Sequence, residues 1–344
     1  MKNTYRVLKD SLLTYYKYGI IGNWVRIDAS TLCQLECPIC PHQKKGAMDK
    51  IGYGYLTFNN FKKFVDTHQS IKNIELSGYG EIFLNPLLLD IIRYANKKGI
   101  NLSAINGVNF NSVSEEVLEA MVKYRFRSIC ISLDGSTGDT YKVYRKGGNF
   151  SQVIRNIELI NKFKIIYKTD FPILIWQFII FGHNEHELSI AKKRALELKM
   201  IFSPRFNWEP SFSPIKNKDL VRKQVGAASE KEWAQKKSQP YLPHCLNLWT
   251  SPQINWDGKL LGCCVNHWGD FGNVFESGLK KCFKSEKYIY AKKMVLKKKP
   301  PRDDIGCYYC PYFKNNNRLN LLKMFYGASP ITMLLRIIRK KLYF

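Results

Sequence analysis

Short apolar runs rich in β-branched residues alternate with amphipathic stretches through the first two thirds of the chain. Apolar residues that recur every three or four positions predict helices, and short apolar runs predict strands. The predicted strands are Trp24–Asp28, Asn73–Ser77, Asn101–Ile105, Ser128–Leu133, Ile173–Ile180 and Phe202–Trp208. The predicted helices are Phe58–Thr67, Pro86–Lys98, Ser114–Lys123, Ser151–Phe163 and Glu185–Lys199.

This alternation implies parallel strands joined by right-handed crossovers. Six units are too few to close an eight-stranded barrel, so we expect an α/β fold, either a partial (β/α)6 TIM-like barrel or an open sheet. Active groups of such folds collect at the C-terminal ends of the strands. Asn85 before Pro86 predicts a capped helix start with proline in the first turn.

The periodicity divides the chain into five predicted segments. They are an N-terminal extension (1–23), a core domain (24–210), a linker or covering helix (211–240), a small β-hairpin and helix domain (241–315) and a basic amphipathic tail (316–344). A basic amphipathic helix can lie on an anionic membrane surface. The sequence leaves open whether the tail does so or docks on the protein.

The chain of 344 residues has a net charge of +26. Lysine pairs occur throughout the sequence, which favours an evenly basic surface over a nucleic-acid-binding stripe. We find neither a signal peptide nor an apolar run long enough to span a bilayer. Ten cysteines without a secretion signal indicate a reducing compartment and metal ligation. We therefore expect a cytoplasmic protein.

Cys33, Cys37 and Cys40 lie in one short loop directly after the first predicted strand. Three thiolates can hold three irons of a 4Fe–4S cube and leave the fourth iron open for chemistry. The alternatives are core thiols, or a structural zinc site with His42 as the fourth ligand.

The spacing C-x3-C-x2-C resembles the signature of the radical S-adenosylmethionine (radical SAM) enzymes. The resemblance implies a 4Fe–4S cluster whose open iron binds S-adenosylmethionine and whose reduced form generates a 5′-deoxyadenosyl radical. It also implies an electron donor such as flavodoxin or ferredoxin. Ile39 stands where the family usually has an aromatic residue against the adenine, which preserves apolar contact but not stacking.

Motifs at the next three strand ends extend the resemblance. The run Ser-Gly-Tyr-Gly-Glu ends the second strand, and its Gly80 and Glu81 correspond to the family motif whose backbone carbonyls bind the amino group of S-adenosylmethionine. By the same resemblance Asn106 lies near the ribose, and Ser132 and Arg145 hold the carboxylate. A guanidinium suits that role because it donates two charge-assisted hydrogen bonds to a carboxylate.

Four further cysteines, Cys245, Cys263, Cys307 and Cys310, resemble the truncated SPASM domain called twitch, with a hairpin predicted to turn at residues 257–258. The resemblance implies one auxiliary 4Fe–4S cluster, with zinc on the same thiols as the alternative. The sequence leaves open whether Cys263 or its neighbour Cys264 is the ligand. Cys130, in a predicted strand, is expected to pack in the core.

A cluster closed by four cysteines has no free iron for substrate, which favours electron transfer or a structural role. We therefore expect a radical SAM oxidoreductase that dehydrogenates a small polar metabolite such as a sugar or cyclitol. The alternatives are a peptide maturase or epimerase, and a basic, zinc-containing nucleic-acid-binding protein.

Overall fold

The computed structural model describes residues 22–44, 46–238, 241–242 and 244–314. Most of the predicted N-terminal extension and the whole predicted amphipathic tail lie outside these residues. Within them, none of the helices is long and apolar enough to cross a bilayer.

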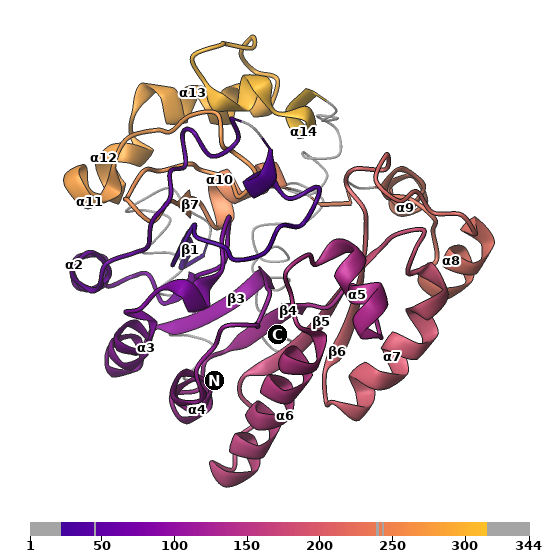
Figure 1. Cartoon of the computed structure of the whole chain (residues 1–344). Coiled ribbons are helices and arrows are strands. Elements are labelled where there is room, and N and C mark those ends of the chain that lie inside the picture. Colours follow the sequence, from indigo (N-terminus) through magenta and orange to yellow (C-terminus); the bar gives the residue numbers. More distant parts are fainter. Residues whose placement is uncertain (1–21, 45, 239–240, 243, 315–344) are drawn as a thin grey trace, which may run out of the picture.

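A single parallel sheet organises the molecule, in the order β6-β5-β4-β3-β2-β1-β7 (Figure 1). Six of its strands are the predicted ones: β1 (Trp24–Ile27), β2 (Asn73–Glu75), β3 (Asn101–Val108), β4 (Ser128–Ser132), β5 (Ile173–Ile180) and β6 (Ile201–Phe206). Because β6 and β7 are the two edges of the sheet, the barrel is open. The prediction of a partial α/β barrel is confirmed.

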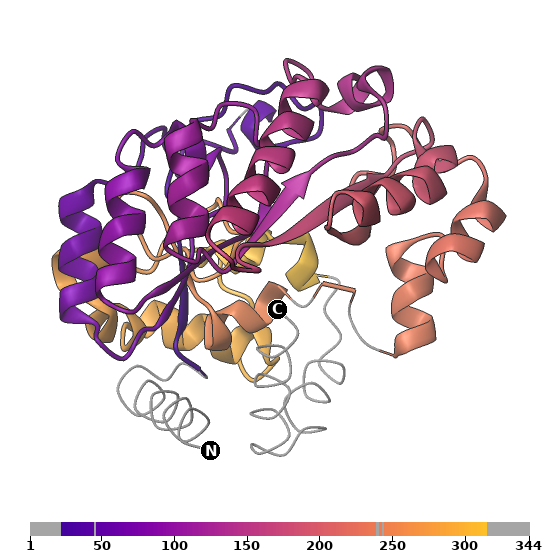
Figure 2. The same cartoon turned by 90° about the horizontal axis from the view of Figure 1, so that it is seen from below.

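Five helices follow the strands and cover their outer side (Figures 1 and 2). They are α2 (Phe58–Thr67), α3 (Leu88–Lys97), α4 (Glu115–Lys123), α6 (Phe150–Ile166) and α7 (Leu188–Glu197), the last preceded by the 3-10 turn η3 (Glu185–Glu187). Local capping explains their starts: the side chains of Thr57, Ser114 and Asn149 accept hydrogen bonds from first-turn amides of α2, α4 and α6.

The predicted start of the second helix at Pro86 is wrong. Helix α3 begins at Leu88, and Asn85 instead ends the 3-10 turn η2 (Ile82–Leu84). The Asn85 side chain accepts a hydrogen bond from the Leu87 N–H and donates to the carbonyls of Ala29 and Leu56. Asn85 therefore joins the start of α3, through Leu87, to the segments after β1 that contain Ala29 and Leu56.

One helix of the first domain was not predicted, and the predicted linker or covering helix consists of two helices. Helix α5 (Gly138–Tyr144) follows β4 and carries Arg145 at its C-terminal cap. The segment predicted as a linker or covering helix contains two short helices, α8 (Lys218–Val225) and α9 (Glu230–Lys237).

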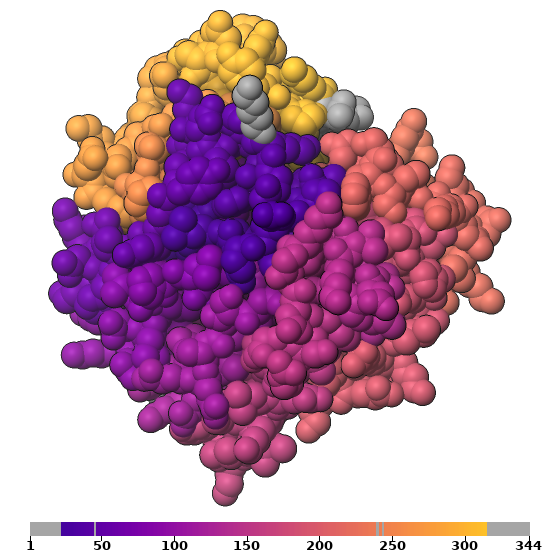
Figure 3. Space-filling model, viewed as in Figure 1, coloured from indigo at the N-terminus to yellow at the C-terminus, as the bar shows by residue number. Residues whose placement is uncertain are grey.

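The C-terminal part joins the sheet directly. It contains η4 (His244–Leu246), α10 (Asn247–Thr250), β7 (Gln253–Ile254), α11 (Val274–Ser277), α12 (Leu279–Phe283), α13 (Glu286–Val295), η5 (Gly306–Tyr309) and α14 (Pro311–Lys314). Strand β7 pairs in parallel with β1, with Arg26 opposite Gln253. The orange and yellow C-terminal residues therefore pack against the indigo N-terminal strand and its loop (Figures 1 and 3).

The hairpin predicted in this region is present. Ile254 and Leu260 form an antiparallel bridge, and the Gly258 N–H donates to the Asn255 carbonyl across the turn. Gly258 has φ +94°, and a Cβ there would lie 2.4 Å from the Asn273 side-chain oxygen. Glycine is required here both for its backbone conformation and for lack of space.

The two faces of the sheet differ in polarity. Val25, Ile27, Ile74 and Ile129 belong to the apolar core that the outer helices cover. Alternate residues of a strand point to opposite faces, and the residues that alternate with this core are mainly polar: Arg26, Asp28, Glu75, Ser103, Ser132 and Gln177. The inner face of the open barrel is therefore suited to polar ligands.

Candidate iron–sulfur and cofactor site

The cysteine triplet lies at the C-terminal end of β1, as predicted. Cys37 and Ile39 are buried in one apolar cluster with Tyr144, Ile179 and Phe181, and Cys33 and Cys40 pack against that cluster. The Cys40 N–H donates to the Cys37 carbonyl at 3.0 Å, which folds the loop tightly. One apolar shell therefore surrounds all three thiols.

The chemistry of this loop fits an iron–sulfur cluster. Burial, together with the nearby Glu81 carboxylate and the sulfurs of Cys37 and Cys40, raises the pKa of Cys33 to about 11. Burial also raises the pKa of Cys40, so thiolates in this apolar loop would be stabilised by a bound cation. Amide and guanidinium donors also face two of the sulfurs: Asn109 Nδ2 lies 3.7 Å from Cys33 Sγ, and Arg145 Nη1 lies 3.7 Å from Cys37 Sγ.

Two observations weigh against zinc. Nε2 of His42, the proposed fourth ligand, lies 2.8 Å from the Thr31 carbonyl oxygen, a contact it makes as a donor. In the part of the chain that the structure describes, no group of three or more Cys, His, Asp or Glu side chains converges to hold a single metal ion. A 4Fe–4S cube spreads its cysteine ligands over several irons and does not need such convergence.

The end of β2 packs on the backbone that leads into the cysteine loop. A Cβ on Gly80 would lie 2.5–2.6 Å from backbone atoms of Ser30, Thr31 and Leu32. The Glu81 N–H donates to the Leu32 carbonyl at 2.7 Å. Only glycine permits this approach, which brings the Gly80 backbone beside the predicted cluster.

The Glu81 side chain points into the protein and holds the end of β3. One of its oxygens accepts a hydrogen bond from the Asn109 N–H at 2.5 Å, which places the Asn109 amide near Cys33. Burial raises the pKa of Glu81 to about 7, although the surrounding backbone N–H groups lower it. Asn109 was not recognised in the sequence, because its role depends on this long-range contact.

Asn106 has an exposed side chain at the same edge of the sheet. Its backbone N–H donates to Ser77 Oγ at 3.0 Å and lies 3.4 Å from Glu75 Oε1. This backbone is fixed while the amide side chain is accessible, as a ribose contact would require. Glu75 was also missed by sequence analysis.

Ser132 is buried at the end of β4, where its Oγ accepts a hydrogen bond from Gln177 Nε2 at 3.4 Å. A Cβ on Gly107, which has φ +117°, would lie 2.8 Å from the same Oγ. The Cys130 sulfur faces Gln177 Oε1 at 3.8 Å. Cys130 is 2% exposed and counts among the buried core residues, as expected; within the core it lies on the inner face of β4, beside Gln177.

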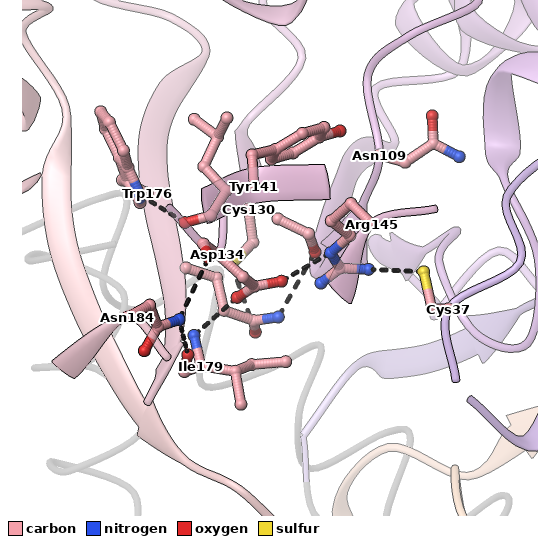
Figure 4. Close-up of polar contacts among 12 residues, drawn as sticks. Cys37, Asn109, Cys130, Asp134, Tyr141, Arg145, Trp176, Ile179 and Asn184 are labelled. Atoms are coloured by element: carbon pink, nitrogen blue, oxygen red, sulfur yellow. Dashed lines mark hydrogen bonds and ion pairs between the residues drawn. The ribbon is translucent and has the colours of Figure 1, made fainter. Parts of the chain in front are cut away.

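Arg145 reaches from the end of α5 to the cysteine loop (Figure 4). Its Nε forms an ion pair with Asp134 Oδ2 at 2.5 Å while Nη1 faces Cys37. Burial alone would lower the pKa of Arg145, but Asp134 and the Cys37 sulfur raise it well above its usual value. The guanidinium therefore remains charged, and Asp134 is its anionic partner.

The second set of cysteines comes together in the C-terminal part. Cys245, Cys263, Cys307 and Cys310 all line one small cavity, with otherwise mainly apolar walls that include Leu248, Val295 and Phe313. Four thiols around one apolar space fit the four-cysteine ligation of an auxiliary cluster.

Cys264 does not line this cavity. Its sulfur lies 3.5 Å from His244 Nδ1 and 3.4 Å from Asn247 Nδ2. We therefore propose Cys263 as the ligand, because it lines the cavity with the other three cysteines and Cys264 does not.

Comparison with known proteins adds family information. Residues 27–191 match the family model described as the radical SAM superfamily, and residues 245–311 match SPASM, an iron–sulfur cluster-binding domain. A GTP 3′,8-cyclase of Alkaliphilus metalliredigens is 28% identical over 171 residues, which cover 48% of this chain and 50% of the cyclase. One from Clostridium botulinum is 26% identical over 225 residues, 60% and 65% of the two chains. The chain thus spans about half to two thirds of the length of these curated relatives.

Solved structures share the fold. Streptococcus suis SuiB bound to S-adenosylmethionine superposes with a TM-score of 0.62 at 13% identity, covering 92% of this chain and 78% of SuiB. The enzyme anSMEcpe with bound AdoMet gives a TM-score of 0.59 at 18% identity, covering 84% and 86% of the two chains. At these identities the likeness concerns the fold alone.

Proposed function

Because the chain belongs to the radical SAM superfamily and carries a SPASM-type iron–sulfur domain, we propose that it oxidises a small polar metabolite such as a sugar or cyclitol. Its cofactors are a 4Fe–4S cluster with S-adenosylmethionine, and iron–sulfur chemistry in the SPASM domain. When bound, these groups supply a 5′-deoxyadenosyl radical that removes a hydrogen atom from the substrate and a site that accepts the remaining electron.

The protein's own residues would hold these groups in place. Cys33, Cys37 and Cys40 would ligate the first cluster inside their apolar shell, which excludes water from the reaction. The Gly80 backbone would bind the amino group of S-adenosylmethionine. Arg145 would contribute a nitrogen to the carboxylate.

The groups proposed to contact the rest of the cofactor meet at the same edge of the sheet. Ser132 would also face the carboxylate, Asn106 the ribose and Ile39 the adenine. Ser132 ends β4, Asn106 lies near the end of β3, and Ile39 lies in the cysteine loop after β1; these positions support the proposed contacts.

The proposal of an oxidation rests on the four cysteines that line one cavity, Cys245, Cys263, Cys307 and Cys310. Four protein ligands would leave a single auxiliary cluster with no free iron for substrate, and we propose that it accepts an electron and is not purely structural. Removal of a hydrogen atom, a proton and an electron from one substrate amounts to oxidation by two electrons.

A buried polar seam between β1 and β7 supports a polar substrate. Arg26, Gln253 and Asn255, and Tyr79 after β2, each contain a buried side-chain atom without a hydrogen-bond partner among the described residues. Asp28, between them, contacts Gln253 and the Tyr79 backbone. Arg26 and Gln253 are paired across the two strands. Unpaired buried polar groups are costly, and a site that keeps several together is suited to a ligand rich in hydroxyl or amino groups.

An electron must also reach the first cluster from outside. The net charge of +26 favours an acidic electron-transfer protein, such as a flavodoxin or ferredoxin, as the donor. Raised ionic strength should then slow reduction of the cluster by that donor, because screening weakens the attraction.

Anaerobic turnover tests the proposal. The protein with reconstituted clusters is incubated with S-adenosylmethionine, a reductant and, in separate reactions, polyols, aminated cyclitols, GTP and a precursor-type peptide. We expect 5′-deoxyadenosine and a product two hydrogens lighter than a polyol or cyclitol. Conversion of GTP would overturn the proposal in favour of a cyclase, and modification of the peptide in favour of a maturase.

Two further outcomes would also contradict it. A product of unchanged mass and altered configuration would indicate epimerisation. Zinc without iron or sulfide after anaerobic purification, together with salt-sensitive binding of nucleic acid, would support the non-enzymatic alternative.

A further inference from the structure

A buried ion pair holds a charged donor against a predicted cluster ligand. Arg145 Nε donates to Asp134 Oδ2 at 2.5 Å, and Nη1 of the same guanidinium lies 3.7 Å from Cys37 Sγ (Figure 4). The Arg145 side chain is 12% exposed and that of Asp134 is 0% exposed. A pair so well shielded from water is only weakly screened.

Asp134 is itself fixed from the opposite side. Its second oxygen, Oδ1, accepts a hydrogen bond from the Ile179 N–H of β5 at 2.6 Å. Asn184 Nδ2 donates to the Asp134 carbonyl at 3.1 Å and to the Ile179 carbonyl at 2.8 Å. The carboxylate therefore has two donors, one from the rigid sheet and one from Arg145, and it cannot move away from either.

The guanidinium has a second support. It lies over the Tyr144 ring with its central carbon 4.9 Å from the ring centroid, a cation–π arrangement. Asp134 and Tyr144 together leave Arg145 one orientation, in which Nη1 points at the sulfur. Nε and Nη1 of Arg145 make these hydrogen bonds, whereas Nη2 makes none to the described residues. Nη2 is therefore available for a cofactor carboxylate.

Hydrogen bonds to ligand sulfurs are one of the means by which a protein sets the reduction potential of an iron–sulfur cluster. A donor N–H stabilises negative charge on the sulfur, and the reduced cluster carries one more negative charge than the oxidised cluster. An N–H group directed at Cys37 should therefore raise the reduction potential.

We propose that Asp134 is a positioning residue that holds Arg145 against Cys37, and that this contact raises the reduction potential of the cluster ligated by Cys33, Cys37 and Cys40. The inference rests on the proposed cluster ligation at those three cysteines. Arg145 would then affect the reduction potential of the cluster in addition to binding S-adenosylmethionine.

The substitution Asp134→Asn distinguishes two effects on the reduction potential: the displacement of Arg145 and the loss of a negative charge. Asparagine has one side-chain oxygen, so it can accept from either Ile179 N–H or Arg145 Nε, and its amino group would oppose the other donor. Arg145 should be released, because the backbone N–H of β5 cannot move. The potential should then fall, whereas the loss of a negative charge alone would make it rise. The sign of the shift is therefore decisive.

Arg145→Lys provides an independent test. Lysine keeps the positive charge but lacks the planar fork that reaches Asp134 and Cys37 at once. A potential that falls in R145K supports the hydrogen-bond contact, because net charge is unchanged. If D134N does not incorporate its clusters, R145K alone decides the question.

The measurement is the midpoint potential of the cluster in the reconstituted, full-length protein, followed by electron paramagnetic resonance. The auxiliary cluster gives a separate signal, so the first cluster's signal is assigned in the wild type by its change when S-adenosylmethionine is added, and the signal with the same g values is followed in the variants without the cofactor. We expect a lower midpoint potential in both D134N and R145K than in the wild type. An unchanged or higher potential in either loaded variant overturns the inference.

Glu187→Gln is the matched control. Glu187 is a buried carboxylate beside the segment that joins β4 to α5. It accepts hydrogen bonds there from the Ser136 N–H at 2.7 Å and from the Thr140 hydroxyl at 2.9 Å. No hydrogen bond joins it to Arg145 or the cysteines among the described contacts, so E187Q should leave the potential unchanged. A wild type without a signal that responds to S-adenosylmethionine would contradict the proposed function itself, whereas a normal wild type with unshifted variants would contradict only the role of Asp134.

Discussion

Glu75 Oε1 accepts a hydrogen bond from the Ile105 N–H at 2.8 Å, so a carboxylate on β2 holds the end of β3. The same carboxylate also accepts from the hydroxyl groups of Ser77 and Ser103 and from the Ser77 N–H. Every one of these partners is a donor. The buried carboxylate therefore links the two strand ends that carry the predicted cofactor residues Gly80 and Asn106.

Glu75→Gln should destabilise the protein. The new amide group would face donors where an acceptor is required, and a buried unsatisfied donor costs about 1–3 kcal/mol. We expect a lower thermal midpoint and weaker binding of S-adenosylmethionine, measured by scanning calorimetry and equilibrium dialysis. Glu116→Gln is the control, because Glu116 pairs with Arg93 on the surface and such pairs contribute little. Equal midpoints for E75Q and the wild type would contradict this role of Glu75.

Gly80→Ala should weaken the first cluster and abolish binding of S-adenosylmethionine. The added Cβ would lie 2.5 Å from the Thr31 carbonyl carbon, and backbone atoms cannot give way as a flexible side chain can. Iron content and equilibrium dialysis measure the effect. Gly138→Ala is the matched control, because its nearest neighbour would be Phe150 Cβ at 3.9 Å. Normal cofactor binding in G80A would show that the close approach is not needed.

Iron and sulfide analysis should separate the two cysteine sets. Two 4Fe–4S clusters correspond to about eight irons per chain, and we expect Cys37→Ala and Cys310→Ala each to remove about half of them. Cys282→Ala serves as the control, because Cys282 is buried beside Ser277 and belongs to neither set. The loss of iron in C282A but not in C37A would refute the assignment.

Cys263→Ala and Cys264→Ala should differ from each other. Cys263 lines the four-cysteine cavity, whereas the Cys264 sulfur faces His244 at 3.5 Å. We expect C264A to keep the full iron content and C263A to lose the auxiliary cluster. The reverse result would make Cys264 the ligand.

Asp28 should make stability depend on pH. Burial raises the pKa of Asp28 to about 8, far above the usual range of an aspartate. Between about pH 4 and pH 8 the folded protein thus keeps a proton that the unfolded chain has lost, so this group makes stability fall as pH rises. Asp28→Asn removes this decrease in the free energy of unfolding, which is on the order of a few kcal/mol at pH 8.

The measurement is the thermal midpoint of D28N relative to the wild type at pH 5, 6.5 and 8. The difference should increase in favour of D28N with pH. Asp139→Asn is the control, because Asp139 is exposed at the first turn of α5. A pH-independent difference for D28N would mean that Asp28 is charged in the folded protein.

Local patterns were enough to predict much of the fold. Helix α2 has the predicted bounds, because Thr57 caps it and its apolar residues lie on one face. Helix α5 was missed because its seven residues are too few for a periodic signal. Strand β7 is the first arm of the predicted hairpin, but its parallel pairing with β1 was missed because two residues carry no pattern that names a distant partner.

The order of the residues was sufficient to identify the chemistry: thiol spacing in a loop after a strand is a local property, and so is the alternation of strands and helices. It could not identify Asp134, Glu75 or Asn109 as parts of the site. Their roles depend on partners from other strands, namely Arg145, Ile105 and Cys33. Nor could the sequence decide whether Cys263 or Cys264 is the ligand, since only the folded structure shows which of the two lines the cavity of the other three cysteines. Hydrogen bonds and burial are set by distances in space, and these exist only once the chain has folded.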